Sequence, residues 1–285
     1  MLQHAFHARG RPSPAAIGRR EDGGAVAADH GLPPVVARMW GREPASRHGP
    51  RPSLDLATIT AAAIEIADRE GLAGVRMSSV ASRLGVATMS LYRYVGSKDD
   101  LLTAMVDASA PEPPVLEGCT WRAYLAAWTR ANHDVLLSRP WLLEVTRTSP
   151  PSGPRSMRWL DRALAALADA GLEPGESINV ATTLTGYALS QATLAHSLNL
   201  GRAAAAEHDV TGAASYARML ASLLDPEEYP ALSAAVAADA FGSAEEWIDD
   251  ADFRFGLDLL LDGVETLVAR RAAGRTAGTD DAVSR

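Results

Sequence analysis

Cysteine and lysine are almost absent from this chain of 285 residues. The single cysteine, Cys119, excludes an intramolecular disulfide and a structural zinc cluster, and it favours a reducing compartment such as the cytoplasm. The single lysine, Lys98, stands in a chain whose other side-chain cations are arginines. It follows Gly96-Ser97 at an expected helix start, where backbone amides and a compact ammonium group can together hold a phosphate.

Long apolar runs are also missing. No uncharged apolar stretch reaches the roughly 18 residues that a transmembrane helix needs, so the sequence predicts no membrane partner. Clusters of β-branched and aromatic residues, which are typical of strands, are scarce, whereas alanine is abundant. A hydrophobic content of 47% is sufficient for a buried core. Together these features predict an all-α fold.

Patterns that signal catalysis or metal binding do not occur. Four of the seven histidines lie in the first 50 residues, and the remaining three, His133, His196 and His208, are isolated. There is no His-x-x-Glu-His motif, and the glycine-rich phosphate loops GxGxxG and GxxxxGK are absent. We therefore expect neither an enzyme nor a bound metal or cofactor.

The net charge of −8 is unevenly distributed. Residues 1–50 carry seven arginines and four acidic residues, and residues 51–101 carry six basic and six acidic residues. The remainder carries fourteen arginines and twenty-five acidic residues. Because an acidic body repels DNA, a duplex would be held against the N-terminal part only. The overall charge therefore neither supports nor excludes DNA binding.

The clearest pattern is RMSSVASRLGVATMSLYRYVGSK, residues 76–98. Val80, Ala81 and Leu84 follow helical spacing, and Leu91 and Val95 resume it after a break at Gly85. Glycine readily takes the positive φ that a sharp reversal needs, so the pattern predicts two short helices joined by a tight turn. This is the layout of a helix-turn-helix, whose second helix enters the major groove of DNA.

The outward face of the second helix has groups suited to DNA. Hydroxyls, a guanidinium and phenols can bond phosphates and base edges, and Met89 can meet a thymine methyl. A small helical hairpin with an ordinary polar surface is the alternative. The expected DNA-binding residues are Arg76, Ser78, Ser79, Thr88, Met89, Ser90, Tyr92, Arg93, Tyr94 and Lys98.

The run LGVATMSLYRYVGSKDDLL resembles the DNA-binding signature of the TetR family of bacterial regulators. The match extends over residues 51–105 and rests on Gly85-Val86, Leu91-Tyr92, Tyr94-Val95 and Lys98. One position departs from the family pattern. Relatives usually place serine or threonine at the position of Arg76, as the N-cap of the helix that contains Val80. Arginine cannot accept amide protons. Ser78 is therefore expected to cap a slightly later helix start.

The resemblance and the breakers along the chain divide it into four parts. Residues 51–110 form the expected DNA-binding domain of three helices, residues 111–273 a larger helical effector-binding and dimerisation domain, and residues 274–285 a disordered tail. Residues 1–50 are expected to be a disordered basic extension. Either this is a flexible arm that adds phosphate contacts, or Met39 is the true start and residues 1–38 are not native.

Helix signals support this division. Asp55, Ser97 and Thr120 are expected N-caps, and Gly71 and Gly171 expected helix ends. The helix 98–109 is expected to be the only mechanical link between the two domains. Further helices are expected at 120–138, 140–147, 155–170, 175–204, 213–224, 227–240 and 250–272.

The resemblance implies a small, mostly hydrophobic effector in the second domain. Helical bundles hold such ligands between helices, in pockets lined by aromatics and a few polar groups. Each tryptophan taken alone is more often part of a core. The candidate pocket residues are Met105, Trp128, His133, Trp141, Trp159, Thr183, Tyr187 and Gln191.

Two late helices, 175–204 and 250–272, carry wide apolar stripes with small residues between the large ones. Packing inside one domain would explain such stripes. In TetR-family proteins the corresponding helices pair across a two-fold axis, and this favours a homodimer interface. Its expected residues are Leu184, Ala188, Ala192, Ala195, Leu257, Leu260, Val264 and Leu267.

The expected function is that of a ligand-responsive repressor. As a homodimer it would bind a palindromic operator in double-stranded DNA, in the bacterial cytoplasm and on the nucleoid, and an effector would release it. An effector-independent DNA-binding or architectural protein is the alternative. The operator, the effector and the choice between repression and activation stay open.

Overall fold

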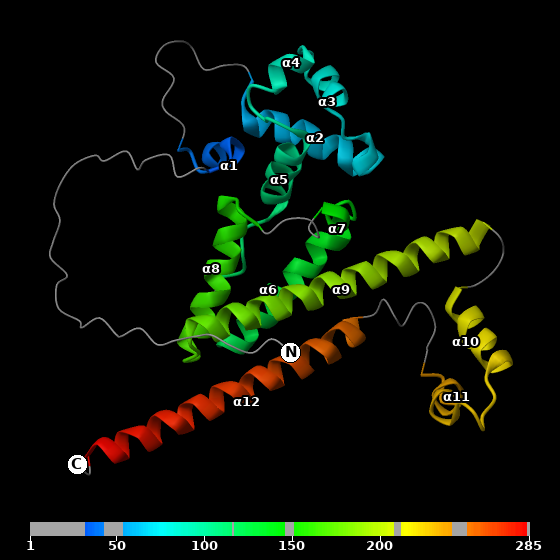
Figure 1. The fold of residues 1–285 in the computed structure, drawn as a ribbon. Helices are drawn as coiled ribbons and strands as arrows, with labels where there is room; N and C mark the ends of the chain where they lie inside the picture. The colour runs from blue at the N-terminus through cyan, green and yellow to red at the C-terminus, as the bar shows by residue number, and fades with distance from the viewer. Residues whose placement is uncertain are drawn as a thin grey trace, which may run out of the picture. The chain divides into compact units, whose positions relative to one another are not determined.

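The computed structural model describes residues 32–42, 54–115, 117–145, 151–207, 212–240 and 250–283, and over these ranges every regular element is helical, as predicted (Figure 1). Side chains are described for the same ranges except 198–216, 250 and 274–283. In this part of the chain no helix combines the length and the apolarity that crossing a bilayer requires.

Figure 1 shows the helices in their order along the chain. They are α1 (Pro34–Met39), α2 (Leu56–Glu70), the 3-10 turn η1 (Leu72–Gly74), α3 (Met77–Leu84), α4 (Thr88–Leu91), α5 (Lys98–Ser109), α6 (Trp121–Ser138), α7 (Leu142–Val145), α8 (Pro154–Asp169), α9 (Pro174–Glu207), α10 (Gly212–Leu223), α11 (Pro230–Ala237) and α12 (Asp250–Val283).

The three predicted N-caps are confirmed. The carboxylate of Asp55 accepts the Thr58 amide at 2.7 Å, the Ser97 hydroxyl accepts the Asp100 amide at 3.0 Å, and the Thr120 hydroxyl accepts the Ala123 amide at 3.2 Å. Each bond satisfies an amide that the first helical turn leaves without a partner, which fixes where α2, α5 and α6 begin.

Helix α12 is longer than predicted, because it runs to Val283. Residues 274–283, which were expected to belong to a disordered tail, are part of this helix, and their side chains lie outside the described residues. The segment has many small and polar residues, which suggested disorder. However, no proline interrupts it, so the helix can continue.

The prediction that residues 1–50 are disordered is wrong for α1. Val35 and Val36 are buried on the DNA-binding half, and the Arg38 guanidinium donates to the backbone carbonyl of Tyr94. A helix of six residues has too few turns to show a 3.6-residue period, so the sequence carried little sign of it. Residues 1–31 and 43–50 lie outside the described residues, and the prediction of a basic arm there stays untested.

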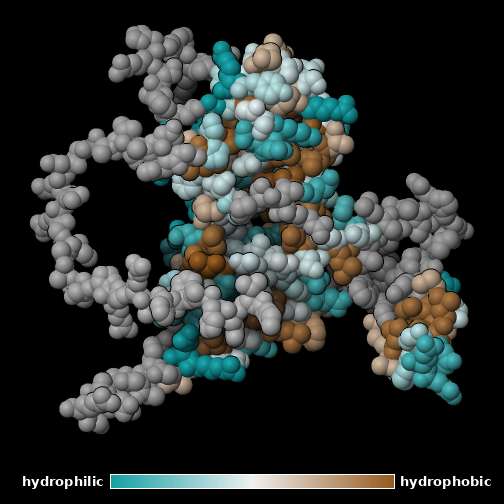
Figure 2. Space-filling model, in the orientation of Figure 1, coloured by the Kyte–Doolittle hydropathy of each residue, from teal (hydrophilic) through white to brown (hydrophobic). Residues whose placement is uncertain are grey.

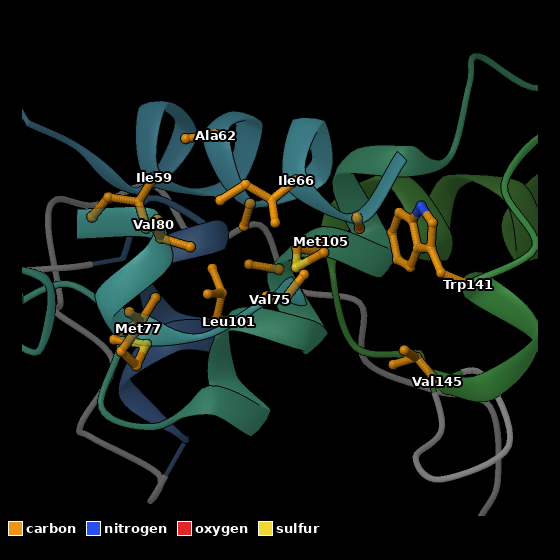
Figure 3. Close-up of a cluster of buried hydrophobic side chains, with 14 of the residues drawn as sticks. Ile59, Ala62, Ile66, Val75, Met77, Val80, Leu101, Met105, Trp141 and Val145 are labelled. Carbon is orange, nitrogen blue, oxygen red and sulfur yellow. The ribbon is translucent and has the colours of Figure 1, made fainter. Parts of the chain in front are cut away.

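One hydrophobic core joins the two predicted domains. Ile59 of α2 and Leu101 and Met105 of α5 belong to the same buried cluster as Trp141 and Val145 near α7 (Figure 3). A second cluster is formed by α6, α8, α9 and α12, around Tyr124, Trp159 and Phe253. The first core crosses the expected boundary after residue 110. Because its side chains are closely packed, a displacement in the second domain would also shift side chains of the DNA-binding half.

The prediction that α5 is the only mechanical link is wrong. Asp68 of α2 accepts the Trp141 indole N–H at 2.8 Å, and the Trp40 indole N–H donates to the Ser152 carbonyl at 2.9 Å. These partners are 73 and 112 residues apart in the sequence, so no local pattern could reveal them.

Candidate DNA-binding surface and effector cavity

The turn between α3 and α4 has the predicted geometry. Gly85 takes a left-handed conformation, with φ of 67° and ψ of 30°, and the Val86 amide returns to the Ala81 carbonyl at 3.0 Å. Ala81, Leu91 and Val95 are buried, as expected for residues at the crossing of the two helices. The short α4 is followed by a further turn, in which the Val95 amide donates to the Leu91 carbonyl at 3.0 Å.

The predicted DNA-contacting residues lie on one continuous segment that presents polar side chains to solvent. Met89 and Tyr92 are large side chains with 74% and 43% of their surface exposed, which is unusual without a partner. The others are exposed or half-buried: Arg76, Ser78, Arg93 and Lys98 are exposed, and Ser79, Thr88, Ser90 and Tyr94 are half-buried. In Figure 2 the surface over α3 and α4 is largely hydrophilic.

The two tyrosines of this surface differ. Tyr92 is exposed, whereas Tyr94 is half-buried and packs against the first core cluster. The guanidinium carbons of Arg38 and Arg93 lie 5.5 Å and 5.9 Å from the centre of the Tyr94 ring. Tyr94 thus lies at the flank of the surface, because α1 and the core hold part of its ring.

The expected cap at Ser78 is also wrong. Helix α3 already begins at Met77, and Arg76 occupies the N-cap position with no side-chain cap bond. The extended backbone of Arg76 (φ of −127°, ψ of 148°) lets its carbonyl accept the Val80 amide at 3.0 Å, which sets the earlier start. The first-turn amides of α3 thus lack a side-chain acceptor.

A cavity of about 940 Å³ lies between α5, α6, α7, α8 and α9. Its walls are mostly apolar, and α5 contributes one whole face to them. The volume is within the range of small-molecule sites in proteins. The residues that line it include Leu102, Val106, Val135, Leu136, Leu142, Leu160 and Leu189 among the apolar ones, and Asp99, Asp107, Ser109, Asn132 and Glu144 among the polar ones.

Trp128 and Trp159 are the two predicted pocket residues that line this cavity. Their ring centres are 6.0 Å apart. The Trp128 indole donates to the Trp159 carbonyl at 3.0 Å, and the Trp159 indole donates to the Pro111 carbonyl at 2.6 Å. The rings therefore offer the cavity apolar area and π-electrons, with their N–H groups already used.

The other six predicted pocket residues are not among those that line this cavity. His133 and Tyr187 pack on Phe253 of α12, with ring centres 4.5 Å and 5.3 Å from its ring. Burial raises the pKa of Tyr187, whose hydroxyl donates to the Phe253 carbonyl at 2.8 Å. The remaining four are Met105 in the first core, Trp141 bonded to Asp68, Thr183 beside a smaller cavity between α9 and α12, and Gln191, half-buried on α9.

Sequence reasoning missed the cavity face of α5. Residues at helical spacing line the cavity, namely Asp99, Leu102, Thr103, Val106, Asp107 and Ala110. Met105 is the one residue of this helix that was predicted to line a pocket, and it is buried in the first core instead. An apolar stripe wider than one neighbouring helix can cover was the available signal.

Most of the predicted dimer-interface residues are buried within one chain and therefore expose little surface to a partner. Leu184, Ala188 and Ala192 of α9 and Leu257 and Val264 of α12 pack inside the protomer. Ala195, Leu260 and Leu267 are half-buried. The large apolar side chains that α12 leaves in solvent are instead Phe255 and Leu259, which are 70% and 58% exposed.

Hydrophobic surface is also present on the α10–α11 pair (Figure 2). Met219 and Leu223 of α10 and Leu232 of α11 are exposed there. This pair is separate from the cavity, since none of its residues is among those that line it.

Comparison with known proteins gives two family matches. Residues 59–105 match the family model of bacterial regulatory proteins of the tetR family, and residues 113–268 match the tetracyclin repressor-like C-terminal domain. The gap between the two matches, residues 106–112, includes the end of α5.

Several known proteins are similar to this chain over most of its length. It is 35% identical over 238 residues to the HTH-type transcriptional repressor DrrR1 of Streptomyces coeruleorubidus, covering 82% of this chain and 85% of that protein. It is 32% identical over 177 residues to an HTH-type transcriptional regulator of Saccharopolyspora erythraea, covering 60% and 75%. The crystal structure of ActR from Streptomyces coelicolor in complex with actinorhodin shares the fold, with a TM-score of 0.63, 23% identity and coverage of 75% and 98%.

Proposed function

Because this chain belongs to the TetR family of bacterial regulatory proteins, we propose that it is a repressor that binds a palindromic operator as a homodimer and is released by a small effector. The observation that carries this proposal is the arrangement of α5. This helix begins at Lys98, next to the exposed α3–α4 surface, and its later turns form a wall of the cavity.

DNA would be bound through the α3–α4 surface. Helix α4 lies in the major groove in this proposal, where Thr88, Met89 and Tyr92 reach base edges and the neighbouring backbone. Lys98 and Arg93 bind phosphates, and Lys98 does so beside the first-turn amides of α5. Tyr94 acts from behind the surface, because α1 and the core hold its ring.

A second copy of the chain would complete the binding site. One domain of this size makes few base contacts, and two domains about one duplex turn apart read a palindrome. Phe255 and Leu259 stand one helical turn apart on α12, and Gly263 continues the row with open space around its Cα. A self-complementary α12 pair would bury these apolar side chains.

The effector would act by occupying the cavity. A ligand shifts the protein towards the DNA-free state only if it binds that state better, typically by about 1–3 kcal/mol. Since α5 borders the cavity and shares the core with α2, a small displacement of α5 moves the whole DNA-binding half. In this proposal the displacement changes the spacing of the two recognition surfaces.

Footprinting the purified full-length protein on the DNA upstream of its own coding region tests this function. The expected result is a protected site with inverted symmetry, whose protection is lost when a cavity-binding compound is added. Protection that no cavity-binding compound changes would favour an effector-independent DNA-binding protein. Absence of any preferred site would overturn the proposal.

A further inference from the structure

We propose that the cavity takes a lipophilic organic cation, that is, a flat apolar molecule with a protonated amine. The inference rests on the proposed function, because it specifies the chemical class of the effector. It follows from three properties of the cavity wall: the sign of its charges, the direction of its hydrogen bonds and one buried hydroxyl without a partner.

All charged side chains that line the cavity are carboxylates. They are Asp99 and Asp107 on α5 and Glu144 on α7, and no arginine, lysine or histidine is among the described lining residues. Asp107 is buried, so its field is screened less than in water, whereas Asp99 and Glu144 are exposed and act more weakly. The charges of all three repel an anion and attract a cation. Among the described lining residues, none offers a carboxylate or phosphate ligand a counter-charge.

The carboxylates are spread along the wall. Asp99 and Asp107 are about 12 Å apart along the helix axis, at 1.5 Å per residue. Among the described residues no three His, Cys, Asp or Glu side chains come close enough to hold a metal ion. The charge pattern therefore suits an extended organic cation better than a metal ion.

Hydrogen-bond donors in the wall are largely engaged with the protein backbone. Beside the two indoles, Thr103 donates to the Asp99 carbonyl at 2.9 Å and Thr185 to the Ala181 carbonyl at 2.9 Å. The Asn132 amide donates to the Trp128 carbonyl at 3.0 Å. The two threonine hydroxyls therefore leave lone pairs for a ligand, and Asn132 leaves its amide oxygen and one N–H. A ligand that donates, such as an ammonium, matches the lone pairs.

Ser109 gives an independent sign that a polar ligand group is expected. This residue lines the cavity and is only 5% exposed, yet its hydroxyl has no hydrogen-bond partner. Buried polar atoms in native structures are seldom left unpaired, and an unpaired one calls for a further partner such as a water, an ion or a ligand group. The hydroxyl is on the same helix as Asp107, two residues further on.

A matched set of tricyclic probes tests the ligand class. The probes are 9-(aminomethyl)anthracene, 9-anthracenemethanol and 9-anthraceneacetate, which share one ring system and are cationic, neutral and anionic at neutral pH. Binding to the full-length protein is followed by the change in anthracene fluorescence. The expected result is that the cation binds roughly tenfold more tightly than the alcohol, as one partly buried charge pair supplies, and that the anion binds most weakly.

Three variants test which wall residues cause the preference for the cationic probe. The double variant Asp99→Asn/Glu144→Gln keeps the shape of two exposed wall residues and is expected to reduce the cation preference from about tenfold to about threefold or less. Ser109→Ala is expected to weaken the cation and the alcohol alike by a few-fold. Asp161→Asn removes an exposed carboxylate of α8 that does not line the cavity, and it should leave all three affinities unchanged.

Equal binding of the three probes, binding of none of them, tighter binding of the anion, or a cation preference that survives the double variant overturns the ligand class. Release of operator DNA is measured separately with the same probes. A cation that binds with the expected preference but releases no DNA supports the ligand class and contradicts effector control in the proposed function.

Discussion

The carboxylate of Asp107, near the end of α5, accepts the backbone N–H of Ser156, in the first turn of α8, at 2.8 Å. A second bond from the Arg155 amide, at 3.4 Å, joins the same carboxylate to α8. The carboxylate therefore caps α8 from a different helix, and α8 carries Ser156, Trp159 and Leu160 of the cavity wall. A displacement of α8 by a ligand is thus passed directly to the helix that begins at Lys98.

Replacing Asp107 by alanine should destabilise the protein. The change leaves two amides at the start of α8 without their acceptor in a largely buried place, which costs about 1–3 kcal/mol of unfolding free energy. Urea denaturation followed by circular dichroism measures it. Asp161→Ala, on the exposed side of the same helix, should change stability by no more than about 0.5 kcal/mol.

Gly153 provides a second test of this joint. A Cβ atom at Gly153 would lie 2.1 Å from the carboxyl carbon of Asp107, so Gly153→Ala should push the carboxylate away and destabilise the protein. Gly175→Ala, at the start of α9, meets open space and should be neutral or stabilising by roughly 0.5–1 kcal/mol. Equal effects of the two substitutions would contradict the close contact.

Lys98→Ala should weaken binding to all DNA sequences. Because one phosphate contact is lost, the slope of log K against log salt concentration should become shallower by about one unit. Fluorescence anisotropy with labelled duplexes at several salt concentrations measures the slope. Arg270→Ala removes one positive charge from the exposed far end of α12 and should leave the slope as it is. A matching change in both variants would mean that only net charge matters.

Arg38→Ala should weaken DNA binding although Arg38 lies outside the helix-turn-helix. Its guanidinium holds the carbonyl of Tyr94 and stacks near the Tyr94 ring, so the turn after α4 loses a support. A loss of about threefold to tenfold in affinity is expected, with faster amide exchange at residues 92–95. Arg42→Ala removes the same charge four residues later. If this variant keeps the DNA affinity of wild type, the loss in Arg38→Ala comes from the missing contact with Tyr94 and not from the missing charge.

The α12 surface should control assembly. Phe255→Asp or Leu259→Asp places a charge in the proposed apolar contact and is expected to convert a dimer into a monomer in analytical ultracentrifugation. Leu223→Asp, at an equally exposed apolar position on α10, is the matched control and should remain dimeric. A protein that is monomeric without any substitution would contradict the homodimer.

Local patterns predicted the helix-turn-helix, although the start of α3 was placed too late. Asp55, Ser97 and Thr120 act on amides three residues away, and Gly85 acts on its own turn, so the information lies within a few residues. The aromatic residues were harder to assign. An aromatic side chain at helical spacing fits a core or a pocket equally well. Which of the two it belongs to depends on the residues that it contacts in the folded chain.

Those partners are distant in the sequence. Trp141 donates a hydrogen bond to Asp68, 73 residues away, and Tyr187 donates one to the carbonyl of Phe253, 66 residues away. For the same reason the apolar stripes of α9 and α12 could not be divided into a buried and an exposed face. Phe255 and Leu259 differ from Leu257 and Leu261 only by their place around the helix relative to α6 and α9.

The account depends most on the exposed side chains of α4 and the turn after it reading DNA. The direct measurement is the affinity of wild type and of Tyr92→Ala for the footprinted operator and for a scrambled duplex at one salt concentration. We predict that wild type prefers the operator and that Tyr92→Ala loses about tenfold or more of that affinity while keeping its weak binding to the scrambled duplex and its folding transition. Operator affinity that is the same in both proteins would contradict the central claim.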